Sequence, residues 1–222
     1  MARASVKILV IDVGGTNIKV LASGRRTPIK IPSGPRMTPR IMVEEVLAAT
    51  AGWEYDVVSI GYPGPVSHGR PIREPWNLGK GWVRFDYKKA LRRPVRIIND
   101  AAMQALGSYA GGSMLFLGLG TGLGSTMIVD KMLIPLELAH LPYMHGRTYE
   151  EYLGESGFRE LGKRAWRRHV GRVVALFIDA FRVDYIVLGG GNSKRLDDLP
   201  PNTRLGTNAN AFKGGFRLWR DK

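Results

Sequence analysis

The sequence contains no cysteine among its 222 residues, and it has no long apolar segment. Disulfide bonds and zinc sites made of thiolates are therefore excluded, and we expect no zinc. No apolar run approaches the ~20 residues that a membrane-spanning helix needs, and no signal-like apolar region precedes the first predicted strand. The sequence thus predicts a globular protein of the cytoplasm with no membrane partner.

Acidic residues are also scarce, since 19 Asp and Glu stand against 33 Lys and Arg, for a formal net charge of +14. Such a protein attracts polyanions at low salt, including nucleic acid, polyphosphate and acidic metabolites. If residues 158–172 are helical, two basic ridges with i, i+4 spacing result, Arg159-Lys163-Arg167 and Arg164-Arg168-Arg172. A long anion could bind there, with Lys163, Arg167 and Arg168 as candidate contacts, but a solvated basic face explains the run equally well.

The most informative pattern is a pair of glycine turns between apolar runs. The first follows the run from Val6 to Ile11 and is itself followed by a second strand-like stretch. Glycines without a Cβ let a phosphate reach backbone N–H groups, Thr adds a hydroxyl donor, and the Asp carboxylate suits Mg²⁺, directly or through its waters. The candidate residues for the phosphoryl donor are Asp12, Gly14, Gly15, Thr16, Asn17 and Lys19, with Asp12 as the candidate for the metal.

The second glycine turn lies at residues 118–125 and repeats this design, with Gly120, Thr121 and Gly122 as candidate phosphate contacts. The glycine spacing fits neither a dinucleotide fingerprint nor a P-loop. Each turn alone could also be an ordinary β-hairpin. Two such turns, one in each half of the chain, favour a nucleotide or phosphate site.

Apolar periodicity predicts an α/β protein. Strands are expected at residues 5–12, 17–22, 57–60, 95–98 and 185–188, with three more between 113 and 136. Helices are expected at 38–51, capped by Thr38 with Pro39 in its first turn, at 101–110, and over most of 148–181. The long segment 61–84 has no clear periodicity and is a candidate substrate loop. The end of the chain gives no clear signal.

The motifs, taken in order, resemble the ROK family of sugar kinases, which belongs with actin and the heat-shock ATPases. They are DVGGTNIK (12–19), GYPGPV (61–66), WNLGKGW (76–82), IINDAA (97–102), GLGTGLGS (118–125), ELAH (137–140) and VLGGGNS (187–193). HGRTYEEYLG (145–154) and GKRAWRRHV (162–170) look most similar to the polyphosphate glucokinase branch. The cysteine-rich zinc motif of many ROK proteins is missing.

This resemblance implies a two-domain, actin-like α/β fold with a cleft between the domains. By analogy the border falls near residue 98, which gives a small N-terminal domain of residues 1–98 and a larger C-terminal domain of residues 99–222. It also implies that Asp100 is the general base, accepting the proton of a sugar hydroxyl as that oxygen attacks the terminal phosphoryl group. Read from the sequence alone, Asp100 could equally cap the helix that follows it.

The same resemblance implies a hexose site built from polar side chains that hydrogen-bond to the sugar hydroxyls. The candidates are Asn77, Asn99, Asp100, Glu137 and His140. Ala139 stands where the family motif has glycine, and this puts the identity of the sugar in doubt. Trp76 and Trp82 could wall the sugar site or pack in the core.

The glycines Gly189, Gly190 and Gly191 match the turn that lies against the nucleoside of ATP in this family, although a tight connection after a strand needs glycine too. The resulting expectation is a kinase that uses Mg²⁺ and transfers a phosphoryl group from polyphosphate, ATP or both to the 6-hydroxyl of a hexose, with glucose first. The alternative is a catalytically weak sensor of sugar or polyanion. A homodimer is compatible with the sequence, whereas specific DNA binding is not expected, because no helix-turn-helix precedes the first phosphate strand.

Overall fold

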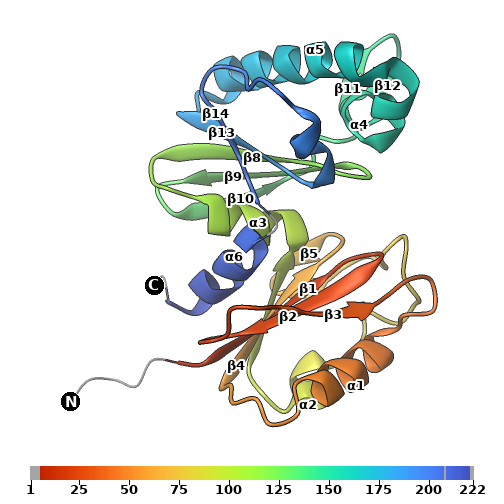
Figure 1. Cartoon of the computed structure of the whole chain (residues 1–222), viewed down its shortest axis with the longest axis vertical. Coiled ribbons are helices and arrows are strands. Elements are labelled where there is room, and N and C mark those ends of the chain that lie inside the picture. The colour runs from red at the N-terminus through yellow and green to blue at the C-terminus, as the bar shows by residue number, and fades with distance from the viewer. Residues whose placement is uncertain (1–5, 208, 221–222) are drawn as a thin grey trace. The chain divides into compact units, whose positions relative to one another are not determined.

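The computed structural model describes residues 6–207 and 209–220, and it divides the chain into two compact units (Figure 1). The first unit contains residues 1–103 and 211–222, and the second contains residues 104–210. The sequence analysis predicted a domain border between residues 98 and 99, with the C-terminal residues in the second domain. In the structure the border lies inside a helix, and the C-terminal helix joins the first unit.

The first unit is built on a five-stranded sheet in the order β3-β2-β1-β4-β7. The strands are β1 (Ile8–Val13), β2 (Asn17–Ala22), β3 (Ile29–Pro32), β4 (Val57–Tyr62) and β7 (Val95–Asn99). A small hairpin is formed by β5 (Val66–Ser67) and β6 (Arg70–Pro71), and the helices are α1 (Pro39–Ala49), α2 (Tyr87–Leu91) and α6 (Ala209–Arg220). Parallel pairing joins β1 to β4 and β4 to β7, so the carboxyl ends of these three strands meet at one edge.

Alternation along β1 explains how helices cover both faces of this sheet. Leu9 and Ile11 belong to one buried cluster together with side chains of α1 and α2, such as Met42. Val10 points to the opposite face and packs in a second cluster with Phe212 of α6. Successive side chains of a strand point to opposite faces, so the apolar run Ile8–Ile11 of β1 requires cover on both sides.

The second unit repeats this arrangement with the sheet order β10-β9-β8-β13-β14. Its strands are β8 (Ser113–Leu119), β9 (Leu123–Val129), β10 (Met132–Leu136), β13 (Tyr185–Gly189) and β14 (Thr203–Leu205), and β11 (Pro142–Met144) pairs with β12 (Arg147–Thr148). Its helices are α4 (Tyr149–Leu153), α5 (Glu155–Phe181) and the short 3-10 helix η1 (Gly191–Arg195). The helix α3 (Asp100–Ser108) runs across the border between the units.

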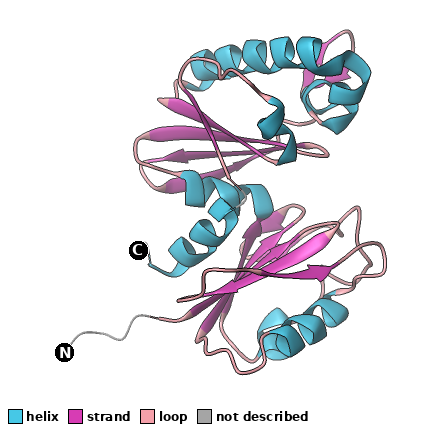
Figure 2. Cartoon of the chain, viewed as in Figure 1, coloured by secondary structure: helices cyan, strands magenta, loops and turns pink. Residues whose placement is uncertain are grey.

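The long helix α5 lies over one face of this sheet, as the ribbon in Figure 2 shows. Val170, Val173 and Phe177 of α5 pack in one buried cluster with Leu115 and Leu117 of β8. Sequence and structure therefore agree on strands joined by tight turns, with helices that cover the sheets. None of the helices in the described residues is long and apolar enough to cross a membrane.

Candidate active site

The first glycine turn joins β1 to β2 and exposes its backbone. Gly14 N–H donates to Asn17 O (3.2 Å), and Gly15 and Thr16 are exposed at the tip. Ser33 braces the turn from outside, because its Oγ donates to Gly14 O (2.5 Å) and its N–H donates to Thr16 O (2.9 Å). The turn is thus a fixed, exposed stretch of backbone, as a phosphate site requires.

The first glycine turn needs glycine because a Cβ would come too close to neighbouring atoms, and not because of its backbone torsion angles. Gly14, Gly15 and Gly122 do not have positive φ, so their backbone torsions do not by themselves require glycine. A Cβ at Gly14 would lie 2.7 Å from Asn17 O, and one at Gly15 would lie 3.3 Å from the Cβ of Asn77. The exposed Asn77 therefore lies beside the first glycine turn.

Asp12 is the residue before the last in β1, close to this turn, and is buried, with 8% of its surface exposed. Lys19 is its partner across the antiparallel pair, and Lys19 Nζ lies 3.2 Å from Asp12 Oδ2. Burial raises the pKa of Asp12, while the charge of Lys19 and its hydrogen bond lower it. The first unit thus holds one carboxylate and one ammonium group directly behind the exposed turn.

Asp100 reaches the same edge of the sheet from β7. The register places Asp12 level with Gly61 of β4, and Gly61 level with Ile98. A Cβ at Gly61 would lie 3.7 Å from the Cα of Asp100, so the glycine allows α3 to begin close against the strand. Side chains at the carboxyl ends of parallel strands are where α/β proteins place reactive groups.

The electrostatics of Asp100 suit a general base. Burial, reinforced by the negative charge of Asp12, raises the pKa of Asp100 to about 7, against smaller opposing effects of hydrogen bonding from Ala101 and of the charge of Lys19. Ala101 N–H donates to Asp100 Oδ1 at 2.8 Å. A base whose pKa lies near neutral pH accepts a proton effectively under physiological conditions.

The structure also separates the two roles considered for Asp100. Asn99 caps α3, since its Oδ1 accepts the N–H of Ala102 (3.1 Å), three residues further on. Its Nδ2 donates to Gly64 O (3.0 Å) and ties the segment after β4 to the start of α3. The bond to the N–H of Ala102 is therefore made by Asn99, whereas the carboxylate of Asp100 accepts the N–H of Ala101, the residue next to it.

In the second unit, the second glycine turn and the glycine run after β13 lie together. Gly120 N–H donates to Gly122 O (3.1 Å), and Asn192 Nδ2 donates to Gly120 O (3.1 Å). Gly190 has φ +79°, and a Cβ there would overlap the backbone of Leu119. Glycine at position 190 is thus explained by close packing of the connection, and its use toward a nucleoside stays a prediction.

Glu150 is a residue of this region that sequence reasoning missed. Its Oε2 accepts the N–H of Leu123 (3.1 Å), and a Cβ at Gly122 would overlap its carboxylate. The neighbouring Glu151 is recognisable from the sequence, because with Thr148 it forms a capping box at the start of α4. Glu150 has no such local pattern, since its partner lies 27 residues away.

The predicted sugar residues Glu137 and His140 are exposed on the loop after β10 in the second unit. Ala139 between them is buried, at 4% exposure, and does not have positive φ. Its methyl group packs in the core of the unit, so the loop tolerates alanine without backbone strain. Of the two roles considered for Trp82, the structure shows core packing, because its side chain is fully buried in the first unit, whereas Trp76 is 96% exposed.

The basic segment at residues 158–172 does not form one continuous helix, so Arg159, Lys163 and Arg167 do not line up as the predicted first ridge. Gly162, with φ 73° and ψ 163°, interrupts α5 and places Arg159 on a separate helical segment. Lys163 and Arg167 both pair with Asp197, the former at 3.2 Å, and Arg167 Nε also donates to Arg195 O (2.8 Å).

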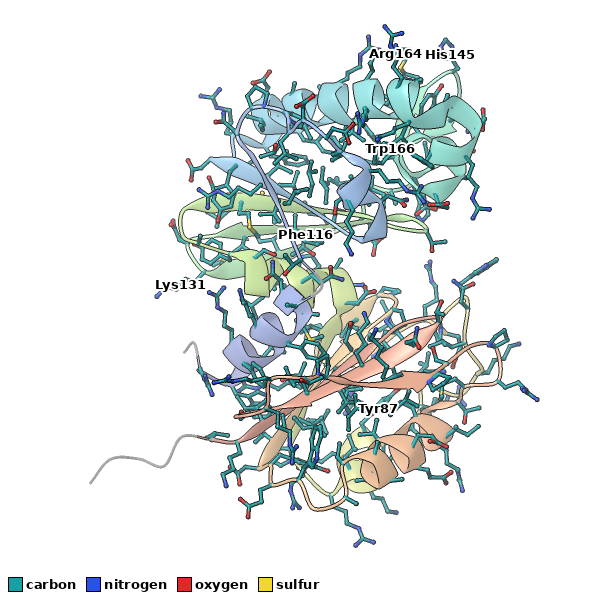
Figure 3. The ribbon with its side chains drawn as sticks, viewed as in Figure 1. Tyr87, Phe116, Lys131, His145, Arg164 and Trp166 are labelled. Atoms are coloured by element: carbon teal, nitrogen blue, oxygen red, sulfur yellow. The ribbon has the colours of Figure 1, made fainter. Side chains whose placement is uncertain are left out.

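The second predicted ridge, Arg164-Arg168-Arg172, lies entirely in the part of α5 that follows Gly162. Arg164 and Arg168 are exposed, and Arg172 lies one turn further along the same face. In Figure 3, Arg164 points away from the unit, whereas Trp166, fully buried, lies on the inner side of α5. Arg172 Nη1 contacts Met144 Sδ at 3.4 Å.

Comparison with known proteins gives a consistent result. No protein-family model matches the chain. It is 29% identical over 213 residues to a polyphosphate glucokinase of Mycobacterium tuberculosis, covering 86% of this chain and 80% of that one. It resembles the structure of an inorganic polyphosphate/ATP-glucomannokinase from Arthrobacter sp. strain KM, with a TM-score of 0.78, 27% identity, and coverage of 96% and 98%.

A ROK family glucokinase from Streptomyces griseus, solved with glucose and AMPPNP, gives a TM-score of 0.75 at 18% identity, over 97% of this chain and 100% of that one. This likeness shows the fold. The comparisons together confirm the resemblance that the motifs indicated.

Proposed function

We propose that this chain, a relative of the ROK family sugar kinases, transfers the terminal phosphoryl group of polyphosphate or ATP to the 6-hydroxyl of a hexose, with glucose as the expected substrate. The observation that carries the proposal is Asp100, a carboxyl group with a pKa of about 7 at the carboxyl end of β7, beside a buried Asp12 and an exposed glycine turn. The relatives named polyphosphate glucokinase and glucomannokinase support the choice of substrates.

In this mechanism Asp100 takes the proton of the 6-hydroxyl while the oxygen forms a bond to the terminal phosphorus. The bond from that phosphorus to its bridging oxygen breaks, and a shortened polyphosphate or ADP leaves. Phosphoryl transfer depends mainly on positioning and charge neutralisation, and a base contributes about 10²- to 10⁴-fold. The backbone of Gly15, the hydroxyl of Thr16 and the ammonium group of Lys19 would hold the donor. Gly14, whose N–H donates to Asn17 O and whose carbonyl accepts from Ser33 Oγ, would shape the turn.

Mg²⁺ fits the first unit at Asp12. This buried carboxylate has Lys19 as its cationic partner, and its charge also acts on Asp100, so a divalent cation would relieve the repulsion between the two acids. Mg²⁺ in phosphoryl-transfer sites is commonly bound by one or two carboxylates together with substrate phosphates and water, so a single carboxylate such as that of Asp12 could supply the protein's share. When bound with the donor, Mg²⁺ would neutralise phosphate charge.

Polyphosphate is proposed to bind along α5. The original candidates were Lys163, Arg167 and Arg168, but Lys163 and Arg167 are engaged by Asp197. The exposed Arg164 and Arg168, with Arg172 next on the same face, provide the cationic surface that is better placed to bind an incoming anion.

The decisive experiment combines the purified chain, Mg²⁺ and a panel of hexoses with ATP and, separately, with polyphosphate. We expect a hexose 6-phosphate to form with at least one donor. Binding of a hexose without phosphorylation by either donor would overturn the proposal and favour the sensor alternative.

A further inference from the structure

The segment between β6 and α2 contains a loop, residues 75–80, that is closed by a single carboxylate. Glu74 Oε2 accepts the N–H groups of Gly81 and Trp82, both at 3.0 Å, and its Oε1 accepts the N–H of Val83 at 3.3 Å. Three consecutive peptide groups therefore point at one anion. Charge-assisted bonds of this type are stronger than those between neutral groups, so Glu74 joins the two ends of the loop firmly.

Further hydrogen bonds tie this loop to the core of the first unit. Tyr62 OH donates to Arg73 O (2.8 Å) just before Glu74. Gly79 N–H donates to Met37 O (2.9 Å), and the buried indole of Trp82 donates through Nε1 to Gly79 O (2.7 Å). The loop is consequently held at its beginning, at its end and near its tip.

What the loop presents to solvent is a pair of adjacent side chains suited to a sugar. Trp76 is 96% exposed, and Asn77 is exposed next to it. A single exposed aromatic residue is not unusual on a protein surface, but here the backbone that carries it is fixed, and Asn77 lies against Gly15 of the phosphate turn. An indole offers a flat apolar surface for the C–H face of a pyranose ring, and an amide can hydrogen-bond to its hydroxyls.

We propose that Glu74 is a positioning residue that holds the 75–80 loop in its binding conformation, and that Trp76 on this loop packs its indole against the apolar face of the hexose. This inference rests on the proposed function, because it names residues that determine sugar affinity in the same site. A loop fixed in advance loses less conformational entropy when it binds, so loss of the Glu74 carboxylate should weaken sugar binding.

The first test is hydrogen exchange of the amides of Gly81, Trp82 and Val83 in the full chain, without substrates. Glu74→Ala should speed their exchange by about tenfold or more, because each loses a charge-assisted hydrogen bond, and Glu74→Gln should restore part of the protection. Glu45→Ala, which removes an exposed carboxylate from α1, is the matched control and should leave these amides unchanged. Unchanged exchange in Glu74→Ala would overturn the positioning role.

The second test separates sugar from donor in the kinase reaction. Glu74→Ala and Trp76→Ala should each raise the KM for glucose about fivefold or more, leave the donor KM within about twofold, and melt close to the parent protein. Trp76→Phe should restore most of the sugar affinity. Equal changes in both KM values, or an unchanged glucose KM in Trp76→Ala, would overturn the role of Trp76.

Binding measured without turnover keeps the two proposals apart. Calorimetric titration with glucose should give a weaker Kd for Trp76→Ala than for the parent chain, even if the parent phosphorylates no hexose. In that event the proposed kinase activity fails while the assignment of Trp76 stands. A parent chain that binds glucose no better than Trp76→Ala would refute the assignment of Trp76 by itself.

Discussion

At the scale of a residue, Asp100 combines a reactive position with a pKa of about 7 that burial and Asp12 raise. Because the deprotonated carboxylate is the base, kcat/KM should increase with pH and level off above about 7. Asp100→Asn should lower kcat by about 10²-fold or more and remove this inflection. Initial rates between pH 5 and 9 on both proteins provide the measurement, and a folded variant with the parent pH profile would refute Asp100 as the base.

The same carboxyl group links stability to pH. An unfolded Asp titrates near 3.9, so between about 4 and about 7 the folded state holds a proton that the unfolded state has lost, and stability falls as pH rises. The shift corresponds to about 4 kcal/mol above pH 7. Asp100→Asn should therefore be more stable than the parent, by more at pH 8 than at pH 5.

Urea unfolding of both proteins at these two pH values gives the free energies of unfolding. A difference between them that does not change with pH would show that Asp100 titrates normally. A larger gain in stability at pH 8 than at pH 5 would show the opposite, that the raised pKa proposed to make Asp100 an effective base also lowers the stability of the folded state.

At the scale of an element, the interruption of α5 at Gly162 separates Arg159 from the cations of the proposed polyphosphate track. Replacing Arg164, Arg168 and Arg172 with Glu should raise the KM for polyphosphate at least tenfold and change the KM for ATP little, because a long anion releases many counterions when it binds. The parent KM for polyphosphate should also increase steeply with salt.

A matched control reverses the same number of charges on an exposed part of the first unit, at Lys88, Lys89 and Arg92. If net charge alone attracts polyphosphate, this control will raise the KM as much as the change in α5. If polyphosphate binds along α5, the KM of the control variant for polyphosphate will stay near that of the parent. If the α5 variant changes the KM for polyphosphate and the KM for ATP equally, α5 is not part of the polyphosphate site.

Elements with a strong local signal were predicted well from the sequence. The apolar run at 57–60 corresponds to β4, and Thr38 caps α1 as expected, accepting the N–H of Ile41 at 3.3 Å. Helix was expected over most of 148–181, and the structure has α4 and α5 there, separated at Gly154. The helix α6 was missed because its two adjacent glycines, Gly214 and Gly215, lower helix propensity and hide its pattern.

The candidate site was predictable only where its proposed residues are contiguous in the sequence. The glycine turns and the Asn99-Asp100 pair are visible in the sequence because strand, turn and helix signals surround them. Glu74 and Glu150 are single acids whose partners lie between 7 and 27 residues away, and only the fold brings them together. The roles of Asn99 and Asp100 could likewise be separated only when hydrogen-bond partners were known.

At the scale of the whole molecule, α6 completes the first unit by packing against its first strand. Ser59 Oγ donates to Gly215 O (2.6 Å), Trp219 Nε1 donates to Ser59 Oγ (3.0 Å), and a Cβ at Gly215 would overlap the side chain of Val10. Gly215→Ala should therefore destabilise the protein by about 1–3 kcal/mol despite the higher helix propensity of alanine. Gly171→Ala in α5, where a Cβ meets nothing within 4 Å, is the control and should not destabilise it.

Thermal unfolding of the two variants measures this effect directly. An equal gain in stability for both would mean that α6 can move away from β1 at no cost. A loss of stability in Gly215→Ala alone would show that α6 and β1 are closely packed against each other.

The return of residues 211–222 to the first unit has a consequence for how the protein is made. During synthesis the strands of the first unit leave the ribosome early, but the helix that covers Ile8 and Val10 is translated only after the whole of the second unit. The second unit is one continuous stretch of chain that emerges complete while part of one face of the first sheet, next to Met103, still lacks its cover. Nascent chains that stop before residue 211 should for this reason be the species that chaperones hold and that aggregates most readily.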